Sequence, residues 1–318
     1  MAARPVLSIV IPCYNEEEVF PLLRERTDRL ITSSQSEFDV EVLFIDDGSR
    51  DRTWPLIEAY AQSRPEVRGL GLSRNFGHQR ALTCGYDACQ GDVIISMDAD
   101  LQDPPELILE MIEKWKQGAD IVHAVRRTRD QDTFFKRATA SAFYSLIRKA
   151  AGPYIEDNVG DFRLMSRRAL NAFNHMREEH RYIRGMVGWM GFQVDRVYFD
   201  RPARAAGVTK YTFIRMFTFA IDAIVSFSAS PLRLAYYVAL TISALVFFYW
   251  GYVIWRHFVY QGELVVGWTS LLLTTTLFGC SNLICLGIMG EYIGRIYDQA
   301  KQRPLYLVKS EATRKSAK

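Results

Sequence analysis

Short apolar runs rich in β-branched residues recur through the first 125 residues, and a polar cluster follows each of the first four. A stretch with helical periodicity follows each of these clusters. Strands and helices that alternate at this spacing are typical of an α/β domain with a mainly parallel sheet, which binds ligands at the carboxyl ends of its strands. The predicted strands cover residues 6–12, 41–46, 67–72, 91–97 and 120–125.

The last third of the chain is far more apolar than the rest. Residues 234–255 and 265–289 contain no charged side chain, and each run is long enough to cross the hydrocarbon core of a bilayer. Buried core helices are the alternative, but two such runs in succession, with tyrosine and tryptophan near their ends, favour a transmembrane hairpin. Residues 233–292 are therefore predicted to hold two membrane helices.

The segments that flank this hairpin are rich in basic residues. Residues 211–232 are aromatic and amphipathic, and we predict a juxtamembrane helix there. Basic residues precede the hairpin and continue after it in the tail, residues 293–318. The positive-inside rule therefore places the large domain, residues 1–210, and the C-terminus in the cytoplasm of a multi-pass protein.

Composition narrows the possible functions. Hydrophobic residues make up 49% of the chain, which is enough for a sizeable core, and the net charge is only +3. A charge this small, without a zinc-finger or RNA-binding motif, argues against nucleic acid as a partner. The five cysteines include no C-x-x-C pair and lie in apolar runs, so they are interpreted as reduced and buried.

The sequence MDADLQDPP contains the strongest chemical signal. Asp98 and Asp100 follow an apolar strand, and residues two apart in a strand point to the same side. Their carboxylates suit Mg²⁺ or Mn²⁺ held with a diphosphate, and Gln102 and Asp103 are close enough to complete the site. A D-x-D pair alone fits a polar turn equally well, so the context must decide.

Other polar clusters also fall at predicted strand ends. They begin at Tyr14, Asp46 and Ser73, and together with the D-x-D pair they would meet along one crevice. The glycine patterns of a dinucleotide-binding domain and of a P-loop are missing from the sequence. Asp161 lies in a predicted glycine-flanked turn before a helix, where it could act as a helix cap.

Several further motifs follow one another along the chain: IPCYNEEE, DDGS, SRNFG, MDADLQDPPE, NVGDFRLMSR, GVTKY and GEYIGRIY. Their order resembles that in bacterial polyprenyl-phosphate glycosyltransferases, a group of family 2 that also contains the dolichol-phosphate mannose synthases. The sequence resembles these enzymes over nearly its whole length. This resemblance implies a GT-A, Rossmann-like nucleotide-sugar-binding domain followed by a two-helix membrane hairpin.

The resemblance also implies roles for individual residues. Donor nucleotide binding would involve Pro12, Tyr14, Glu16, Asp46 and Asp98. The metal ligands would be Asp98, Asp100 and Gln102, with Asp100 and Asp161 as the catalytic residues. Phosphates of the donor or acceptor would contact Arg126, Arg137, Arg201 and Lys210, since an arginine fork suits phosphate.

The expected reaction is an inverting transfer of a sugar, glucose before others, from a UDP-sugar to undecaprenyl phosphate at the bacterial inner membrane, for modification of cell-envelope glycans. Because the acceptor phosphate is already anionic near neutral pH, Asp161 is hypothesised to orient groups more than to remove a proton. The resemblance further implies contact with membrane lipids and a homo-oligomer, with a tetramer as one form.

Three alternatives stay open. The enzyme could transfer a different sugar, namely mannose, GlcNAc, galactose or aminoarabinose. The protein could also be a non-catalytic membrane scaffold or a phosphate-cleaving hydrolase. A processive polysaccharide synthase is disfavoured, because no tryptophan in the sequence follows Q-x-x-R. The five histidines show no metal-ligand spacing, and no role is assigned to them.

Overall fold

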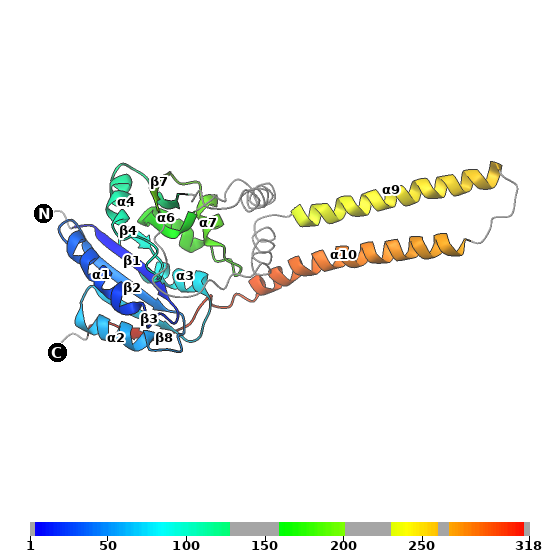
Figure 1. Cartoon of the computed structure of the whole chain (residues 1–318). Coiled ribbons are helices and arrows are strands. Elements are labelled where there is room, and N and C mark those ends of the chain that lie inside the picture. Colours follow the sequence, from blue (N-terminus) through cyan, green and yellow to red (C-terminus); the bar gives the residue numbers. More distant parts are fainter. Residues whose placement is uncertain (1–3, 128–158, 201–229, 260–266, 315–318) are drawn as a thin grey trace.

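A computed structural model describes residues 4–127, 159–200, 230–259 and 267–314 (Figure 1). An α/β body at one end carries a long pair of helices that projects from it. The strands are β1 Val6–Cys13, β2 Asp39–Asp46, β3 Val67–Leu72, β4 Val93–Ser96, β5 Ile121–Arg126, β6 Val159–Ser166, β7 Val194–Phe199 and β8 Val308–Ala312. The helices are α1 Phe20–Ser34, α2 Thr53–Ser63, α3 His78–Ala88, α4 Leu107–Lys116, α6 Arg167–His175, α7 Ile183–Trp189, α9 Ser230–Val259 and α10 Trp268–Ala300.

The described strands form one eight-stranded sheet in the order β7-β5-β6-β4-β1-β2-β3-β8. Strand β1 pairs in parallel with β2 and β4, and β2 pairs in parallel with β3. Strands β6 and β8 run antiparallel to their neighbours. The predicted α/β domain with a mainly parallel sheet is therefore confirmed, and the carboxyl ends of β1, β2 and β4 lie side by side at one edge.

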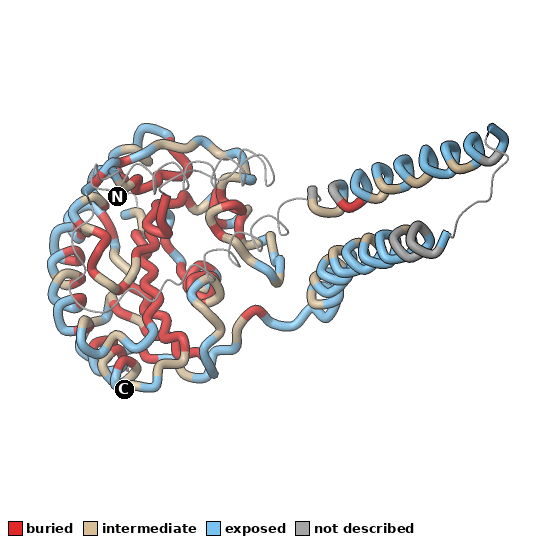
Figure 2. Tube along the Cα trace, turned by 45° about the vertical axis from the view of Figure 1, so that its right-hand side comes forward, coloured by how far each residue is buried: buried red, intermediate tan, exposed pale blue. Residues whose placement is uncertain are grey.

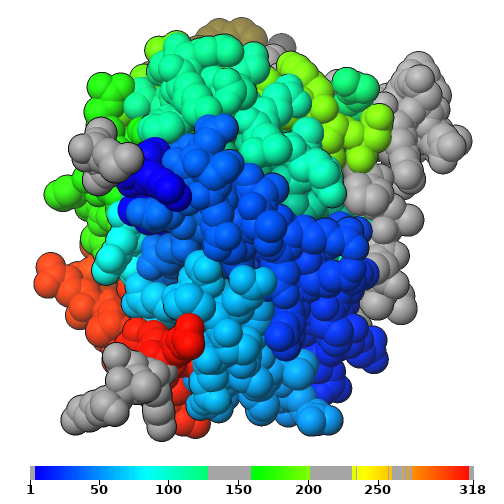
Figure 3. All heavy atoms as spheres, turned by 90° about the vertical axis from the view of Figure 1, so that its left-hand side faces the viewer, coloured from blue at the N-terminus to red at the C-terminus, as the bar shows by residue number. Residues whose placement is uncertain are grey.

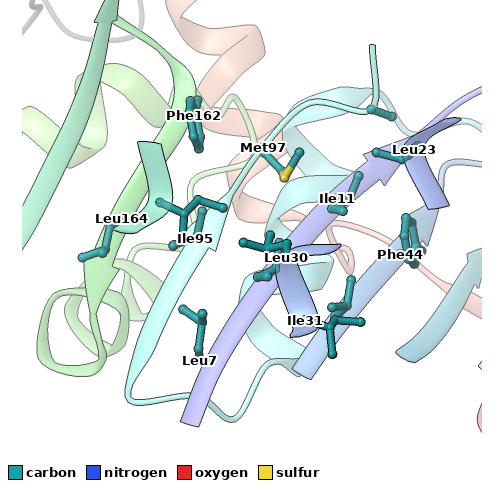
Figure 4. Close-up of a cluster of buried hydrophobic side chains, with 14 of the residues drawn as sticks. Leu7, Ile11, Leu23, Leu30, Ile31, Phe44, Ile95, Met97, Phe162 and Leu164 are labelled. Atoms are coloured by element: carbon teal, nitrogen blue, oxygen red, sulfur yellow. The ribbon is translucent and has the colours of Figure 1, made fainter. Parts of the chain in front are cut away.

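Helices cover both faces of the sheet, which explains why the strands consist of nearly continuous apolar runs. On one face, alternate residues of the strands pack against α1, α2 and α4. Figure 4 shows Leu7 and Ile11 of β1 and Phe44 of β2 near Leu30 and Ile31 of α1. The opposite face packs against α3, α6 and α7. The site at the strand ends is thus supported by two cores.

Strand β6 differs from its prediction. The segment around Asp161 was predicted to be a turn, but it is a strand whose eight residues are all buried between β4 and β5. The strand was missed because its sequence contains polar residues, whose side chains form hydrogen bonds and ion pairs inside the protein instead of facing water. Ser166, not Asp161, caps the next helix, and its Oγ accepts a hydrogen bond of 3.1 Å from the backbone N–H of Ala169.

The C-terminal segment also returns to the body. Helix α10 continues to Ala300, and β8 then pairs antiparallel with β3 at the edge of the sheet. Figure 3 shows this red segment against the blue residues of the body. Gly71 of β3 allows the approach, since a Cβ there would lie 2.4 Å from the Oγ of Ser310. The sequence analysis assigned only a basic tail to this region and missed the strand.

Helices α9 and α10 run beside each other away from the body, and most of their residues are exposed (Figure 2). Within the described residues, segments Pro231–Arg256 and Thr274–Ala300 are long and apolar enough to cross a membrane. Their described residues are exposed or half-buried, apart from Ala235, which is buried. The predicted interfacial segment, residues 211–232, lies almost wholly outside the described residues.

Candidate active site

The carboxyl ends of β1 and β2 present the first group of predicted site residues. Pro12 is the last but one residue of β1 and Asp46 is the last residue of β2, where it pairs with Cys13. Tyr14 follows β1 and is 41% exposed, whereas Asp46 is buried and accepts backbone hydrogen bonds of 3.3 Å from Ser49. Burial raises the pKa of Asp46. This edge therefore offers an open aromatic ring beside a buried carboxylate.

The neighbouring residue Asp47 holds two loops together. Its carboxylate accepts hydrogen bonds from the backbone N–H groups of Phe76, at 2.7 Å, and Gly77, at 2.9 Å. The second of these residues directly precedes α3, so the bonds fix the start of that helix against the end of β2. Helix α3 begins with His78, which the same contact therefore places at the site.

The D-x-D carboxylates lie in a turn that follows β4, because the strand ends at Ser96. The backbone N–H of Asp98 donates to the Oδ2 of Asp103 at 3.0 Å, and the N–H of Gln102 donates to the Oδ1 of Asp100 at 3.1 Å. The argument from strand alternation was therefore wrong for this pair. Side-chain hydrogen bonds within the loop, and not a shared strand face, determine where the carboxylates lie.

The loop supplies oxygen atoms suited to a divalent metal. Gln102 and Asp103 are buried, and among the described residues the Oε1 of Gln102 and the Oδ1 of Asp103 have no hydrogen-bond partner. The described chain contains no group of three or more histidine, cysteine, aspartate or glutamate residues placed to hold a metal ion. Asp98, Asp100 and Gln102 therefore fit a Mg²⁺-like ion only if the substrate's phosphates and water complete its shell.

Asp161 lies at the centre of a cluster of cations. Its side chain is 6% exposed and lies between two arginines. The Nη2 of Arg163 donates to Oδ1 at 3.0 Å, and Arg184 donates through Nε to Oδ1 at 3.3 Å and through Nη2 to Oδ2 at 3.0 Å. The Nε2 of His78 lies 3.4 Å from Oδ2 of Asp161 and 3.6 Å from Oδ1 of Asp98. His78 thus joins this cluster to the loop of residues 98–103, which is called the acidic loop below.

The protonation states follow from these contacts. Burial alone would raise the pKa of Asp161, but its hydrogen bond with His78 and the charges of Arg184 and Arg163 hold that pKa far below its usual range. Burial lowers the pKa of His78, yet contact with Asp161 and the charge of Asp98 raise it overall. Asp161 is therefore a permanent anion at neutral pH.

The acidic loop shows the opposite behaviour. Burial raises the pKa of Asp98, and burial together with the charge of Asp98 raises the pKa of Asp103 to about 7. Clustered carboxylates of this kind are stabilised by a nearby cation. The loop is thus electrostatically suited to a bound metal, whereas Asp161 already has its counterions.

Arg126 is the one predicted phosphate contact within the described residues. It ends β5, and a Cβ at Gly160 would lie 3.2 Å from its Nη2, so the glycine lets the arginine lie against β6. The charge of Arg126 also counteracts the rise in the pKa of Asp103, which places it near the acidic loop. Arg137, Arg201 and Lys210 lie outside the described residues.

Sequence reasoning missed three residues of the cluster. His78 received no role because its partners are distant in sequence, and Arg163 and Arg184 were not selected. One signal was present for Arg163, because residues two apart in a strand share a face. Recognising that signal required the strand assignment that the polar sequence concealed.

Comparisons with known proteins identify the family of this chain. The family model described as glycosyl transferase family 2 matches residues 8–173. An uncharacterized glycosyltransferase of Bacillus subtilis is 43% identical, with 95% of this chain and 92% of the relative covered. A bactoprenol glucosyl transferase of Shigella phage SfV is 41% identical, with 96% and 98% covered.

Solved structures were matched at low sequence identity. Glucosyl-3-phosphoglycerate synthase from Mycobacterium tuberculosis in complex with UDP is 16% identical with a TM-score of 0.46, covering 70% of this chain and 79% of that chain. Mannosyl-3-phosphoglycerate synthase from Rubrobacter xylanophilus has the same identity and TM-score, with 72% and 74% covered. The family model and the near full-length relatives show that this chain is a glycosyltransferase and belongs to glycosyl transferase family 2.

Proposed function

We propose that the enzyme transfers glucose from UDP-glucose to a polyprenyl phosphate, with undecaprenyl phosphate as the bacterial acceptor. The observation that carries this proposal is the position of His78, which joins the acidic loop to the cation-flanked Asp161. One site thus offers oxygen ligands for a metal-bound diphosphate beside a partly exposed arginine, Arg184, for a second phosphate. The full-length relatives named bactoprenol glucosyl transferase support glucose as the sugar.

The donor would bind at the ends of β1, β2 and β4. Pro12, Tyr14, Glu16 and Asp46 would surround the nucleoside, with the exposed ring of Tyr14 available for stacking. Asp98, Asp100 and Gln102 would hold Mg²⁺ or Mn²⁺, which when bound neutralises charge that develops on the departing nucleoside diphosphate. The acidic loop therefore serves the leaving group of the reaction.

The acceptor requires positioning more than activation. A phosphate monoester has a second pKa of about 6, so it is largely a dianion at neutral pH and its oxygen is already nucleophilic. Asp161 is held as an anion by two arginines and cannot easily take a proton. It would instead orient the groups around the acceptor, with Arg126, Arg137, Arg201 and Lys210 as further phosphate contacts. In-line attack from the opposite side of the anomeric carbon would give inversion.

The exposed apolar hairpin supports a site at the membrane. Helices α9 and α10 would cross the inner membrane, with the body and β8 on the cytoplasmic side, where a nucleotide sugar is available. Both ends of the hairpin would then lie near the headgroups, and the acceptor phosphate would be presented to the body. Cross-linking in membranes would test the homo-oligomer that the family resemblance implies.

The proposal is tested by incubating membranes that contain the protein with undecaprenyl phosphate, divalent metal and a panel of radiolabelled UDP-sugars. The matched control carries Asp98→Asn and Asp100→Asn. We expect label from UDP-glucose alone to enter the organic phase, and only with the unmodified enzyme. Transfer of another sugar would correct the donor. No transfer with retained metal-dependent UDP binding would refute the acceptor and reopen the scaffold alternative.

A further inference from the structure

We propose that Arg184 binds the phosphate of the lipid acceptor and that Asp161 holds it in position for this contact. The inference rests on the proposed polyprenyl phosphate acceptor and adds to it a residue that the sequence motifs did not indicate. Arg184 is the second residue of α7, and the contacts of this helix and its preceding loop carry the argument.

The guanidinium of Arg184 is fixed on one edge. Its Nε and Nη2 donate to the two oxygens of Asp161 at 3.3 Å and 3.0 Å, so a single carboxylate sets the plane of the fork. Pre-organisation of this kind reduces the side-chain entropy lost when the remaining donors bind a ligand. The side chain is 37% exposed, which leaves part of the guanidinium accessible from outside.

Arg163 makes a contrasting contact with the same carboxylate. Its side chain is 0% exposed, and its Nη2 also donates to the backbone oxygen of Gly160 at 2.9 Å. Arg163 therefore cannot reach a substrate, although its charge acts on Asp161 at short range. Of the two arginines paired with Asp161, only Arg184 is available to a ligand.

The charge balance favours a phosphate at this position. Two arginines face one carboxylate, so the cluster keeps a net charge of about +1 when His78 is neutral and a metal balances Asp98 and Asp100. An incoming phosphate would compensate this charge through charge-assisted hydrogen bonds. The charge of Asp98 also contributes to the raised pKa of Arg184, so the arginine lies within electrostatic reach of the metal-binding loop.

The chain on the membrane side anchors the segment that carries Arg184. Gln299, near the end of α10, accepts a hydrogen bond from the backbone N–H of Glu179 at 2.8 Å and donates to the backbone oxygen of Arg177 at 3.1 Å. The side chain of Gln79, next to His78 on α3, accepts from the N–H of Ile183 at 2.9 Å. The loop that precedes Arg184 is thus hydrogen-bonded to helix α10 of the hairpin.

These contacts favour the acceptor phosphate, and not the donor diphosphate, as the ligand of Arg184. Helix α7 lies on the side of the body that faces the hairpin (Figure 1). A lipid phosphate would approach from that side, whereas the predicted donor residues belong to β1, β2 and the acidic loop. In the reaction, an acceptor phosphate oxygen bonds to the anomeric carbon, the bond from that carbon to the diphosphate breaks, and the diphosphate departs with the electron pair. Arg184 stays bound to the acceptor phosphate and transfers no proton.

The test compares Arg184→Gln and Arg184→Lys with the unmodified enzyme in separate titrations of undecaprenyl phosphate and UDP-glucose. Arg168→Gln is the matched control, because Arg168 forms a similar fork with Asp120, at 3.2 Å and 2.5 Å, on a largely exposed side chain. We expect Arg184→Gln to raise the KM for the lipid at least about 10-fold, with the KM for UDP-glucose within about 2-fold. Arg184→Lys should recover part of the loss, and Arg168→Gln should match the unmodified enzyme.

A higher KM for UDP-glucose with an unchanged KM for the lipid would overturn the proposal, as would no change in either. If Arg184→Gln fails to fold, the same comparison is made with Arg184→Lys, which keeps the counterion of Asp161. If the unmodified enzyme transfers no sugar, the proposed function fails on its own. The inference is then decided by calorimetric binding of a short-chain polyprenyl phosphate, which Arg184→Gln must weaken.

Discussion

Arg163 and Asp161 lie two residues apart on β6 and form a buried ion pair, with 3.0 Å between Nη2 and Oδ1. The arginine is fully buried, and among the described residues its Nε and Nη1 have no hydrogen-bond partner. Removal of the carboxylate would therefore leave a desolvated charge inside the protein. Asp161 supports the fold as well as the site, and experiments on this residue must measure both.

Asp161→Asn should destabilise the protein by about 3–5 kcal/mol, because it leaves Arg163 without its counterion. The measurement is thermal unfolding of the detergent-solubilised protein. Glu25→Gln serves as the control, since it breaks an exposed pair with Arg29 and should cost less than about 0.5 kcal/mol. Equal melting temperatures for the two variants would contradict the structural role.

The pH dependence should separate a counterion from a catalytic base. The folded-state pKa of Asp161 lies below the unfolded value, so its contribution to stability is complete above about pH 4 and is lost only as pH falls through the folded pKa. The difference in melting temperature between the enzyme and Asp161→Asn should therefore stay constant between about pH 5 and 6, and should narrow at higher pH as His78, whose pKa the contact with Asp161 raises, loses its proton.

The pH dependence of activity tests the same distinction between a counterion and a catalytic base. Measured as kcat/KM between about pH 6 and 9, Asp161→Asn should stay at a low level throughout, since no proton transfer to Asp161 is involved. The unmodified enzyme should lose activity below about pH 6, where the acceptor phosphate gains a proton. A steep recovery of the variant at high pH would show that the carboxylate acts as a base.

Asp98→Asn should abolish activity without the stability loss of Asp161→Asn. Asp98 adds to the negative charge around Asp103, and burial disfavours its ionised form, so a neutral amide should leave the melting temperature unchanged or raise it. Loss of this proposed metal ligand should lower kcat/KM at least about 100-fold. EDTA should inhibit the unmodified enzyme reversibly, and calorimetry should show that the variant no longer binds UDP with Mn²⁺. A marked drop in its melting temperature would argue against this account.

A chain that ends at Gln302 should have a less stable body. It loses β8, the buried side chains of Leu305 and Ala312, and the ion pair between Arg68 and Glu311, with an expected cost of about 2–4 kcal/mol. Hydrogen exchange should show faster exchange of the β3 amides. A chain that ends at Arg314 keeps the strand and should behave like the full protein. Unchanged exchange in the shorter chain would show that β8 contributes no stability.

The sequence predicted the elements whose apolar pattern is uninterrupted. Strands β1 to β5 were found within a few residues, because burial on both faces produces β-branched runs that end at polar turns. The two long helices were found for the same reason, since a run without charges is conspicuous. Strand β6 was predicted as a turn and β8 was missed, because one carries a buried ion pair and the other is a short edge strand with three polar residues.

The site divides in the same way. The sequence determined the acidic loop, the polar clusters at the strand ends and the family, because those residues are local in the chain and form recognisable motifs. Arg163 lies two residues from Asp161 on β6, but only the tertiary structure decided the other partners of Asp161, since His78 and Arg184 come from α3 and α7. The charges of His78 and Arg184 reach Asp161 only in the folded protein. A pattern of residues along the chain records which groups are present, whereas the distance between groups, which sets Coulomb energies and pKa values, exists only in the fold.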